Sequence, residues 1–251
     1  MIVAVGCWRG IGATTAALLL AGSLAAHDEH GCWLIEADPA GGNLAGRMQL
    51  PASTVGGLER LAFPSERLQP LSAYDAVAHD IGRLRIVTAP VEPFRAHACH
   101  QPRLPWVPAL RDLPGHVVVD VGRVRTSTPS WPILAVVDSV LMVSSPEVSA
   151  AVSSNEWMRA GGRVSPDDES LDPAKVRIVF VDAPGGVPFA RTTLQIDLDD
   201  QFGAWLPWEP SVVDLVHRGA RPDDRRLRRS ALIAAIDELA LHLKVEQGAM
   251  A

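Results

Sequence analysis

The stretch that decides the fold is residues 2–15, which read Ile-Val-Ala-Val-Gly-Cys-Trp-Arg-Gly-Ile-Gly-Ala-Thr-Thr. Its apolar start predicts a β-strand over residues 2–7, and the glycines that follow predict a turn. The apolar residues after this stretch predict a helix that begins near residue 13 and ends near residue 26. A glycine turn lets backbone N–H groups approach an anion, and the helix dipole adds partial positive charge. The stretch therefore predicts a loop that cradles phosphate.

One residue of the usual phosphate loop is missing. The P-loop pattern places a lysine directly before the hydroxyl pair, and that position is Ala13 here. The chain has only two lysines, Lys175 and Lys244, so no lysine stands in its N-terminal half. The loop therefore has to hold phosphate without a lysine if it holds phosphate at all. Its candidate ligands are Arg9, Gly10, Ile11, Gly12, Ala13, Thr14 and Thr15.

Strands alternate with helices along the rest of the chain. We expect further strands at residues 32–37, 84–89, 116–121, 139–144 and 176–182, and a last short strand at about 204–207. We expect helices at about 58–62, 133–137, 146–160, 211–218 and 225–243. Nearly all-apolar strands alternating with helices are typical of a parallel sheet. We therefore predict an α/β fold, a mostly parallel sheet flanked by helices on both faces, in a single domain over residues 1–251.

The segments between these elements are less informative. Residues 90–108 contain five prolines and predict a long surface loop. Residues 161–174 predict a polar loop, and residues 64–82 give no clear prediction. We find no internal repeat and no linker that would divide the chain.

Three aspartates follow or end predicted strands: Asp38, Asp120 and Asp182. Ligands of parallel sheets lie at the carboxyl ends of the strands, so these side chains are expected beside the glycine loop. Oxygen ligands suit Mg²⁺, and the candidates are Thr14, Asp38 and Asp120. The alternative is structural: Asp38 and the threonines could cap helices, and Asp120 could hold a turn.

Composition limits the function. The net charge of −6 argues against a general binder of polyanions. The odd number of cysteines predicts reduced thiols, with Cys7 and Cys32 as small core residues. No apolar run is long enough to span a bilayer, and Met1 leads straight into a strand, so we expect a cytoplasmic protein.

Together these segments resemble the deviant P-loop ATPases of the ParA/MinD group, including the pilus-localisation proteins called CpaE or TadZ and the septum-site-determining proteins. The family loop reads Lys-Gly-Gly-Val-Gly-Lys-Thr-Thr, and here Trp8 and Ala13 replace its two lysines. If one residue is skipped, Arg9 falls near the first of these lysines. The family's Asp-x-Asp-Pro loop matches residues 36–39, and its Walker B strand matches residues 117–120.

The resemblance implies further site residues. Asp182 stands where the family often has Asn near the adenine, and the run containing Pro207 and Glu209 resembles the family's segment near the base. The cofactor implied is ATP or ADP with Mg²⁺, bound weakly or not at all. Asp38 would be the residual catalytic residue, positioning Mg²⁺ or the attacking water. The family also implies a homodimer, and we expect Trp8 at or near its contact, formed without nucleotide.

Three functions follow from these features. The first is a positioning or regulatory scaffold for a septum, pilus or chromosome, with a protein partner in a localisation or secretion machinery and with weak or absent ATP hydrolysis. The second is an active ATPase in which an arginine replaces the lysine. The third is a DNA-binding partition protein that uses the arginines of residues 218–229; Asp223 and Asp224 dilute this cluster, so nonspecific DNA binding is not favoured.

Overall fold

Eight strands form one sheet in the computed structural model of the chain, in the order β3-β4-β2-β5-β1-β6-β7-β8. The structure describes residues 1–51, 56–66, 68–101, 103–124, 129–159, 172–182 and 189–250. The strands are β1 Ile2–Cys7, β2 Cys32–Glu36, β3 His79–Ile81, β4 Leu84–Val87, β5 His116–Arg123, β6 Ser139–Ser144, β7 Val176–Val181 and β8 Phe202–Leu206. The helices are α1 Ala13–Ala26, α2 Leu44–Arg47, α3 Gly57–Ala62, α4 Pro70–Asp75, α5 Pro93–Ala98, α6 Trp106–Ala109, α7 Trp131–Val136, α8 Val148–Arg159, α9 Arg191–Leu198, α10 Pro210–His217 and α11 Ala231–Met250.

The sheet is parallel apart from its edge pair, β3 and β4, which runs antiparallel. β1 lies at its centre between β5 and β6, and every residue of β1 is buried. A strand buried on both faces has to be apolar throughout, which is why the sequence shows an unbroken run there rather than an alternation. The predicted fold class and the strands in its centre are confirmed.

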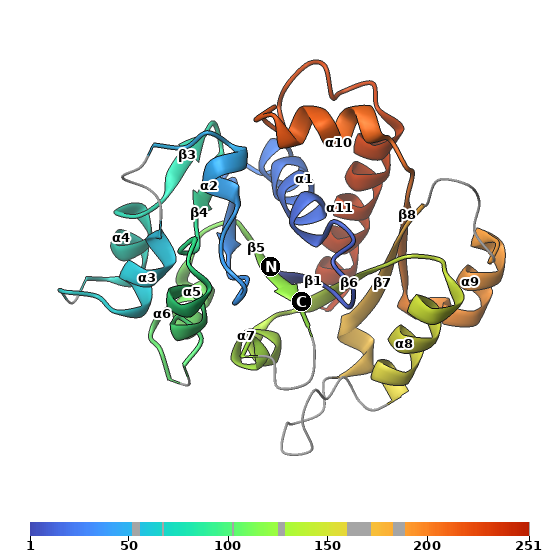
Figure 1. Cartoon of the computed structure of the whole chain (residues 1–251), viewed down its shortest axis with the longest axis horizontal. Helices are drawn as coiled ribbons and strands as arrows, with labels where there is room; N and C mark the ends of the chain where they lie inside the picture. The colour runs from blue at the N-terminus through green and yellow to red at the C-terminus, as the bar shows by residue number, and fades with distance from the viewer. Residues whose placement is uncertain are drawn as a thin grey trace.

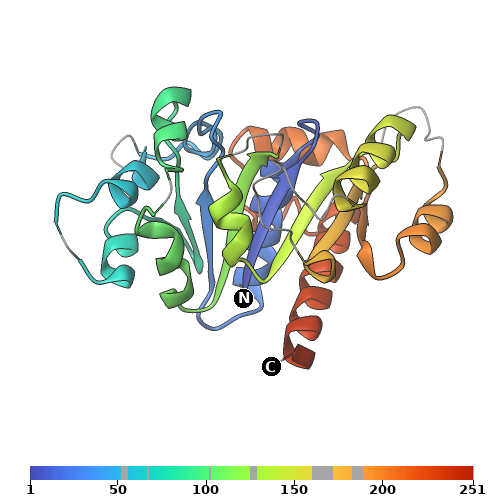
Figure 2. The same ribbon diagram turned by 90° about the horizontal axis from the view of Figure 1, so that it is seen from below.

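Two apolar cores lie on the two faces of this sheet. One contains Val3, Val5 and Leu34 with the buried residues of α1. α11 packs on it through the apolar residues of one face: Leu232, Ile236, Leu239, Ala240 and Leu243. The other contains Ala4, Ile35 and Val119 and is covered by residues from α3, α4, α6, α7 and α8. Figure 1 shows α1, α10 and α11 together on one side, and Figure 2 shows the opposite side from below.

Residues 90–108 correct the prediction of a surface loop. Two short helices, α5 and α6, lie in this range, and Trp106 and Cys99 are buried in the core. Pro93 stands in the first turn of α5, where a proline interrupts no helical hydrogen bond. Proline content alone therefore wrongly predicted a loop.

The predicted helix at 225–243 also needs a correction, because α11 begins only at residue 231. Residues 221–229 form turns, and the Glu209 carboxylate fixes the start of α11. Residues 64–82, which gave no clear prediction, contain α4 and β3. Most of the predicted polar loop at 161–174 lies outside the described residues.

All three cysteines are buried and form no disulfide. In the described part of the chain, no helix has the length and apolar character needed to cross a membrane.

Candidate phosphate-loop site

The glycine loop joins the end of β1 to the start of α1. Gly10 and Gly12 have φ angles of 57° and 97°, a region that side-chain-bearing residues rarely adopt. Gly12 is the N-cap of α1, and no side chain caps the helix there. The threonines therefore do not serve as caps, and the first N–H groups of α1 face the loop.

A cavity of about 730 Å³ lies over this loop, at the carboxyl edge of the sheet. It is lined by almost all of the site residues expected from the sequence: Arg9, Gly10, Ile11, Gly12, Ala13, Thr14, Thr15, Asp38, Asp182, Pro207 and Glu209. Only Asp120 is absent from its wall, because it is fully buried beneath the surface. The fold thus brings together segments from the first, the second and the last thirds of the chain.

Asp120 has an environment that favours a bound cation. Burial raises the pKa of its carboxyl to about 6, against the opposing effects of the Thr14 hydroxyl and the Gly122 N–H. Oδ1 accepts a hydrogen bond from the Gly122 N–H at 3.1 Å. Oδ2 is buried and has no hydrogen-bond partner among the described residues. A buried oxygen without a donor costs free energy, which a metal ion or a water would recover.

Asp38 lies close to Asp120, at the end of β2. Its Oδ1 accepts the Ala40 N–H at 2.8 Å, and its carboxyl packs so closely on Gly122 that a Cβ there would overlap it. Burial raises the pKa of Asp38, while the Ala40 N–H and the charge of Arg123 oppose that rise. Gly122, near the end of β5, has no side chain, and the Asp38 carboxyl occupies that space two residues from Asp120, so the two candidate metal carboxylates lie close together.

Glu36, the first acid of the Asp-x-Asp-Pro match, shapes the loop rather than facing the cavity. Its Oε1 accepts the N–H groups of Asn43 and Leu44 at 2.6 and 2.8 Å, and its Oε2 accepts the Ala89 N–H at 3.0 Å. Burial raises the pKa of Glu36 to about 7 although these three donors oppose it. The carboxylate thus holds the turn that carries Asp38 against the strand end at Ala89.

Ala13, Thr14 and Thr15 begin α1 beneath the cavity. Ala13 is 4% exposed and offers only a methyl group where the P-loop pattern has a lysine. The Thr15 hydroxyl lies 3.4 Å from Nη1 of Arg47 and 3.5 Å from Nε2 of His217. Burial and the Arg47 charge lower the pKa of His217, whereas Asp214 opposes them.

Among the described residues, three arginines line the cavity, Arg9, Arg47 and Arg123, and neither of the lysines does. Arg9 donates to the Ser149 hydroxyl of α8 at 3.1 Å, so it lies along the cavity's rim. Arg47 ends α2, and Arg123 ends β5. Arg47 and Arg123 were not predicted as site residues, because neither belongs to a motif; the position of Arg123 three residues after Asp120 was the available signal.

Both lysines lie at the opposite edge of the sheet. Lys175 donates to the Val137 carbonyl at 3.5 Å, and Lys244 donates to the His27 carbonyl at 3.1 Å. Val137 and His27 precede β6 and β2, at the amino ends of the parallel strands. Neither lysine can therefore reach the glycine loop, which lies at the carboxyl ends. No lysine elsewhere in the chain takes the place that Ala13 leaves empty.

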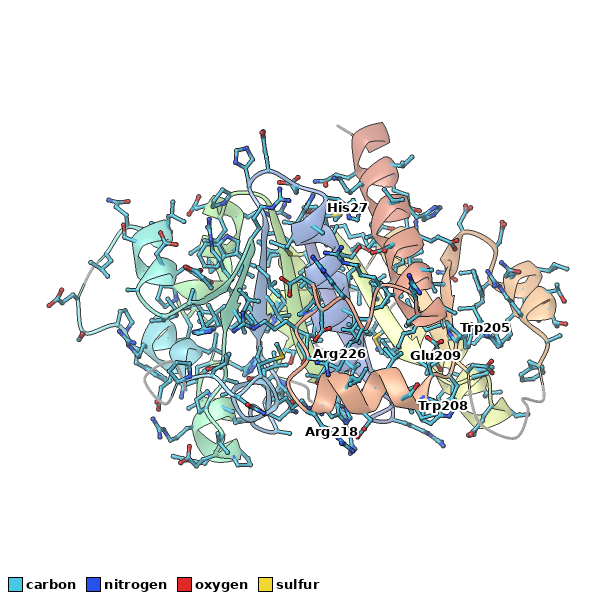
Figure 3. All side chains as sticks on the ribbon, turned by 90° about the horizontal axis from the view of Figure 1, so that it is seen from above. His27, Trp205, Trp208, Glu209, Arg218 and Arg226 are labelled. Atoms are coloured by element: carbon cyan, nitrogen blue, oxygen red, sulfur yellow. The ribbon has the colours of Figure 1, made fainter. Side chains whose placement is uncertain are left out.

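The far end of the cavity is apolar. Its lining consists mainly of apolar side chains, with one carboxylate: Val181, Asp182, Leu206, Pro207, Trp208, Val213, Leu232 and Ile236. Figure 3 shows Trp208 and Glu209 side by side between β8 and α10. The Glu209 Oε2 accepts the Ser230 hydroxyl at 2.6 Å and the Leu232 N–H at 2.8 Å, so Glu209 holds α11 against this end of the cavity.

Trp8 packs within its own chain. It is half-buried, and its ring centroid lies 6.4 Å from that of Trp157 on α8. Its indole therefore fixes the glycine loop against α8, and whether it also meets a second copy stays a prediction.

The arginines of residues 218–229 are partly neutralised. Arg218 pairs with Asp214 at 2.9 Å, and Arg226 pairs with Asp224 at 2.6 Å. Figure 3 shows Arg218 at the end of α10 away from Glu209 and Arg226 on the following segment. Asp224, one of the two acids named in the sequence analysis, and Asp214, which was not named there, thus reduce the positive charge available for phosphates of DNA.

The residues present fit a magnesium–nucleotide complex in part. Thr14, Asp38 and Asp120 supply oxygen atoms, and the unsatisfied Oδ2 of Asp120 suits a cation. No group of three His, Cys, Asp or Glu side chains within the described ranges could hold a metal by itself. A magnesium ion here would therefore need phosphate oxygens to complete its coordination.

No protein-family model matches the chain, and neither does any curated protein. Solved structures do. A ParA family ATPase from Chlorobium tepidum TLS superposes with a TM-score of 0.75 at 13% identity, covering 96% of this chain and 98% of its own. The cell division ATPase MinD of Pyrococcus furiosus gives 0.72 at 15% identity, covering 97% and 98%. The septum site-determining protein MinD of Pyrococcus horikoshii OT3, complexed with Mg-ADP, gives 0.69 at 15% identity, covering 100% and 99%. The chain therefore has the fold of these ATPases along its whole length.

Proposed function

We propose that this chain, which has the ParA/MinD fold, binds a nucleotide and acts as a positioning or regulatory scaffold with weak or absent ATP hydrolysis. The observation that carries the proposal is Ala13. It begins α1 in the wall of the cavity, where a methyl group can neither donate to a phosphate nor neutralise its charge. Losing a charge-assisted bond to phosphate costs about 1.5 to 3 kcal/mol of binding free energy.

Nucleotide binding would use what remains of the site. The N–H groups of the glycine loop and the start of α1 would hold the phosphates, and Thr14, Asp38 and Asp120 would hold Mg²⁺. When bound, Mg²⁺ would neutralise part of the phosphate charge. The apolar end of the cavity, around Trp208 and Leu206, would take the base.

Hydrolysis needs more than binding. Charge that develops as the phosphoryl group transfers has to be stabilised by preorganised cations, and the P-loop lysine is one of them. With alanine at this position, the loss in the transition state exceeds the loss in binding. Asp38 and Asp120 could hold a metal and a water while the transfer itself remains slow.

The test is calorimetric titration with Mg-ATP and Mg-ADP, together with a phosphate-release assay. We expect measurable binding and phosphate release far below that of ParA or MinD. Thr14→Ala should weaken binding, whereas Thr192→Ala, on the exposed face of α9, serves as the matched control. Turnover at a rate typical of these ATPases, abolished by Asp38→Ala, would show the proposal to be wrong.

An active ATPase remains the second candidate, because the cavity contains Arg9, Arg47 and Arg123. A planar guanidinium does not superimpose on a slim ammonium, so arginine would have to reach the phosphate from another direction. The same phosphate-release assay separates the two candidates.

The positioning role and its protein partner are proposed from the fold. A fluorescent fusion imaged in the native cell should form a focus or a polar zone. An even distribution through the cell would contradict this role while leaving nucleotide binding intact.

A further inference from the structure

Arg123 ends β5 beside the glycine loop. β1 and β5 are parallel neighbours, and their register pairs Arg123 with Cys7, the last residue of β1. The guanidinium lies against Gly10: a Cβ added to Gly10 would stand 2.8 Å from Nε of Arg123 and nearer still to Nη2. As placed, the guanidinium occupies the space of a Cβ at Gly10, and the φ of +57° at Gly10 also favours glycine there.

The charge of Arg123 is not used by a salt bridge in the described part of the chain. Arg111, Arg177, Arg218 and Arg226 each pair with a carboxylate at 2.6 to 2.9 Å. Arg123 has no such partner there. It forms no ion pair with Asp38, although its positive charge acts to lower the pKa of the Asp38 carboxyl. Its side chain is exposed and lines the cavity. Its N–H donors can therefore meet an anion that enters.

The other cations at the cavity are engaged differently. Arg9 donates to Ser149, and Arg47 lies against the Thr15 hydroxyl. Arg123 alone among these three lies on the backbone of the glycine loop. At the same edge, Oδ2 of Asp120 is buried and makes no hydrogen bond within the described residues, although the Thr14 hydroxyl lies close enough to lower the pKa of this carboxyl. A cation would satisfy this oxygen, and an anionic ligand such as a phosphate would bring one.

We propose that Arg123 contacts a phosphate group of a bound nucleoside di- or triphosphate and supplies, from the end of β5, the positive charge that Ala13 lacks. This inference rests on the proposed nucleotide binding. Guanidinium groups bind phosphate through two parallel N–H bonds, so one arginine can replace a lysine in binding while standing in a different place. The glycine loop then supplies N–H groups from one side and Arg123 covers the phosphate from the other.

The experiment is titration of the full chain with Mg-ADP and Mg-ATP. Arg123→Gln should weaken binding of both about 10- to 100-fold, and Arg123→Lys should lie between this variant and the wild type. Arg111→Gln is the matched control, since it removes one positive charge at the opposite end of β5. The thermal unfolding midpoint of each variant shows whether the fold is kept.

The outcomes separate the inference from the function on which it rests. A wild-type protein that binds neither nucleotide would overturn the proposed function itself. A wild type that binds, with Arg123→Gln binding equally well in a folded protein, would overturn only the role of Arg123. Equal weakening by Arg111→Gln would also overturn it, because net charge rather than contact would then explain the effect.

Discussion

At the residue scale, the site is defined by one small side chain and by what surrounds it. Ala13 is almost fully buried at the start of α1, yet it belongs to the cavity wall. Arg123 lies across the loop from it, on Gly10. Both positions therefore concern the positive charge that a phosphate would meet in the proposed nucleotide site.

Ala13→Lys should raise the affinity for Mg-ATP about 10- to 100-fold, because it restores a charge-assisted bond to phosphate. Calorimetric titration measures the change. Ala26→Lys is the control, since it adds the same charge at the exposed other end of α1. The gain should be larger in the Arg123→Gln background, where the phosphate contact proposed for Arg123 is lost. An Ala13→Lys protein that binds no better would indicate that the loop does not hold phosphate.

At the element scale, α1 is the helix on which the site is built, and it is held on two sides. It packs on the sheet through residues such as Leu20 and Leu24, and on α11 through the Ser23 hydroxyl, which donates to Asp237 at 2.5 Å. Gly22 faces the segment that contains Pro222, so closely that a Cβ would overlap the proline ring. Because Gly22 has no side chain, the segment that follows α10 can pack directly on α1 at Pro222.

Gly22→Ala should therefore destabilise the protein by about 1 to 3 kcal/mol through overpacking, even though alanine is the better helix former. Urea unfolding measures the free energy of unfolding. Gly46→Ala, in α2, is the matched control because an added Cβ there meets nothing within 4 Å. A stabilised Gly22→Ala protein would show that the segment at Pro222 moves away freely.

The segment from α5 to α6 contains a buried histidine that makes stability depend on pH. His100 is 5% exposed, its ring is edge-on to Trp106, and neither of its nitrogens has a partner among the described residues. Burial, together with the charge of His97, lowers the pKa of His100 to about 4. The folded protein therefore keeps His100 neutral, whereas the unfolded chain takes up a proton below pH 6.5.

Because the unfolded state binds more protons between pH 6.5 and 4, the free energy of unfolding should fall as the pH falls through this window. His100 accounts for up to about 3 kcal/mol of this loss, and His100→Phe should remove that part. Urea unfolding at pH 7.5 and pH 4 measures it. His30→Gln, at an exposed site, should keep the wild-type difference. An unchanged pH dependence in His100→Phe would rule out this origin.

At the scale of the whole molecule, exposed apolar side chains lie near the rim of the cavity. Val148 and Val152 of α8 are 52% and 53% exposed, and Trp208 is 45% exposed. α8 also carries Ser149, which binds Arg9, and Trp157, on which Trp8 packs. An apolar rim of this kind suits contact with a second copy.

We expect a homodimer that forms without nucleotide, with the Trp8 region at its contact. Size-exclusion chromatography with light scattering, with and without Mg-ATP, measures the mass. Val152→Asp should favour the monomer because it places a charge in the contact, while Ile196→Asp, on the exposed face of α9, should not. A monomer in both conditions, or a dimer that requires ATP, would contradict this expectation.

The sequence by itself determined the fold class and which segments line the candidate site. An unbroken apolar strand, a glycine turn and a helix can be recognised locally, because each depends on burial or backbone conformation within a few residues. The ends of parallel strands then meet at one edge of the sheet, so the order of the strands along the chain was enough to place Asp38, Asp120 and Asp182 near residues 9–15. The sequence also established that the P-loop lysine is missing, because residue 13 is an alanine and the identity of a residue does not depend on the fold.

Only the tertiary structure decided which residues surround the glycine loop. Arg123 reaches Gly10 because β5 pairs with β1, and Glu36 holds the turn of Asp38 through N–H groups from Asn43, Leu44 and Ala89. Trp8 proved to pack on Trp157, which is far from it along the chain, and residues 90–108 proved to contain two short helices and buried side chains. These facts depend on strand register and on packing between distant segments, and local patterns of residues carry no information about either.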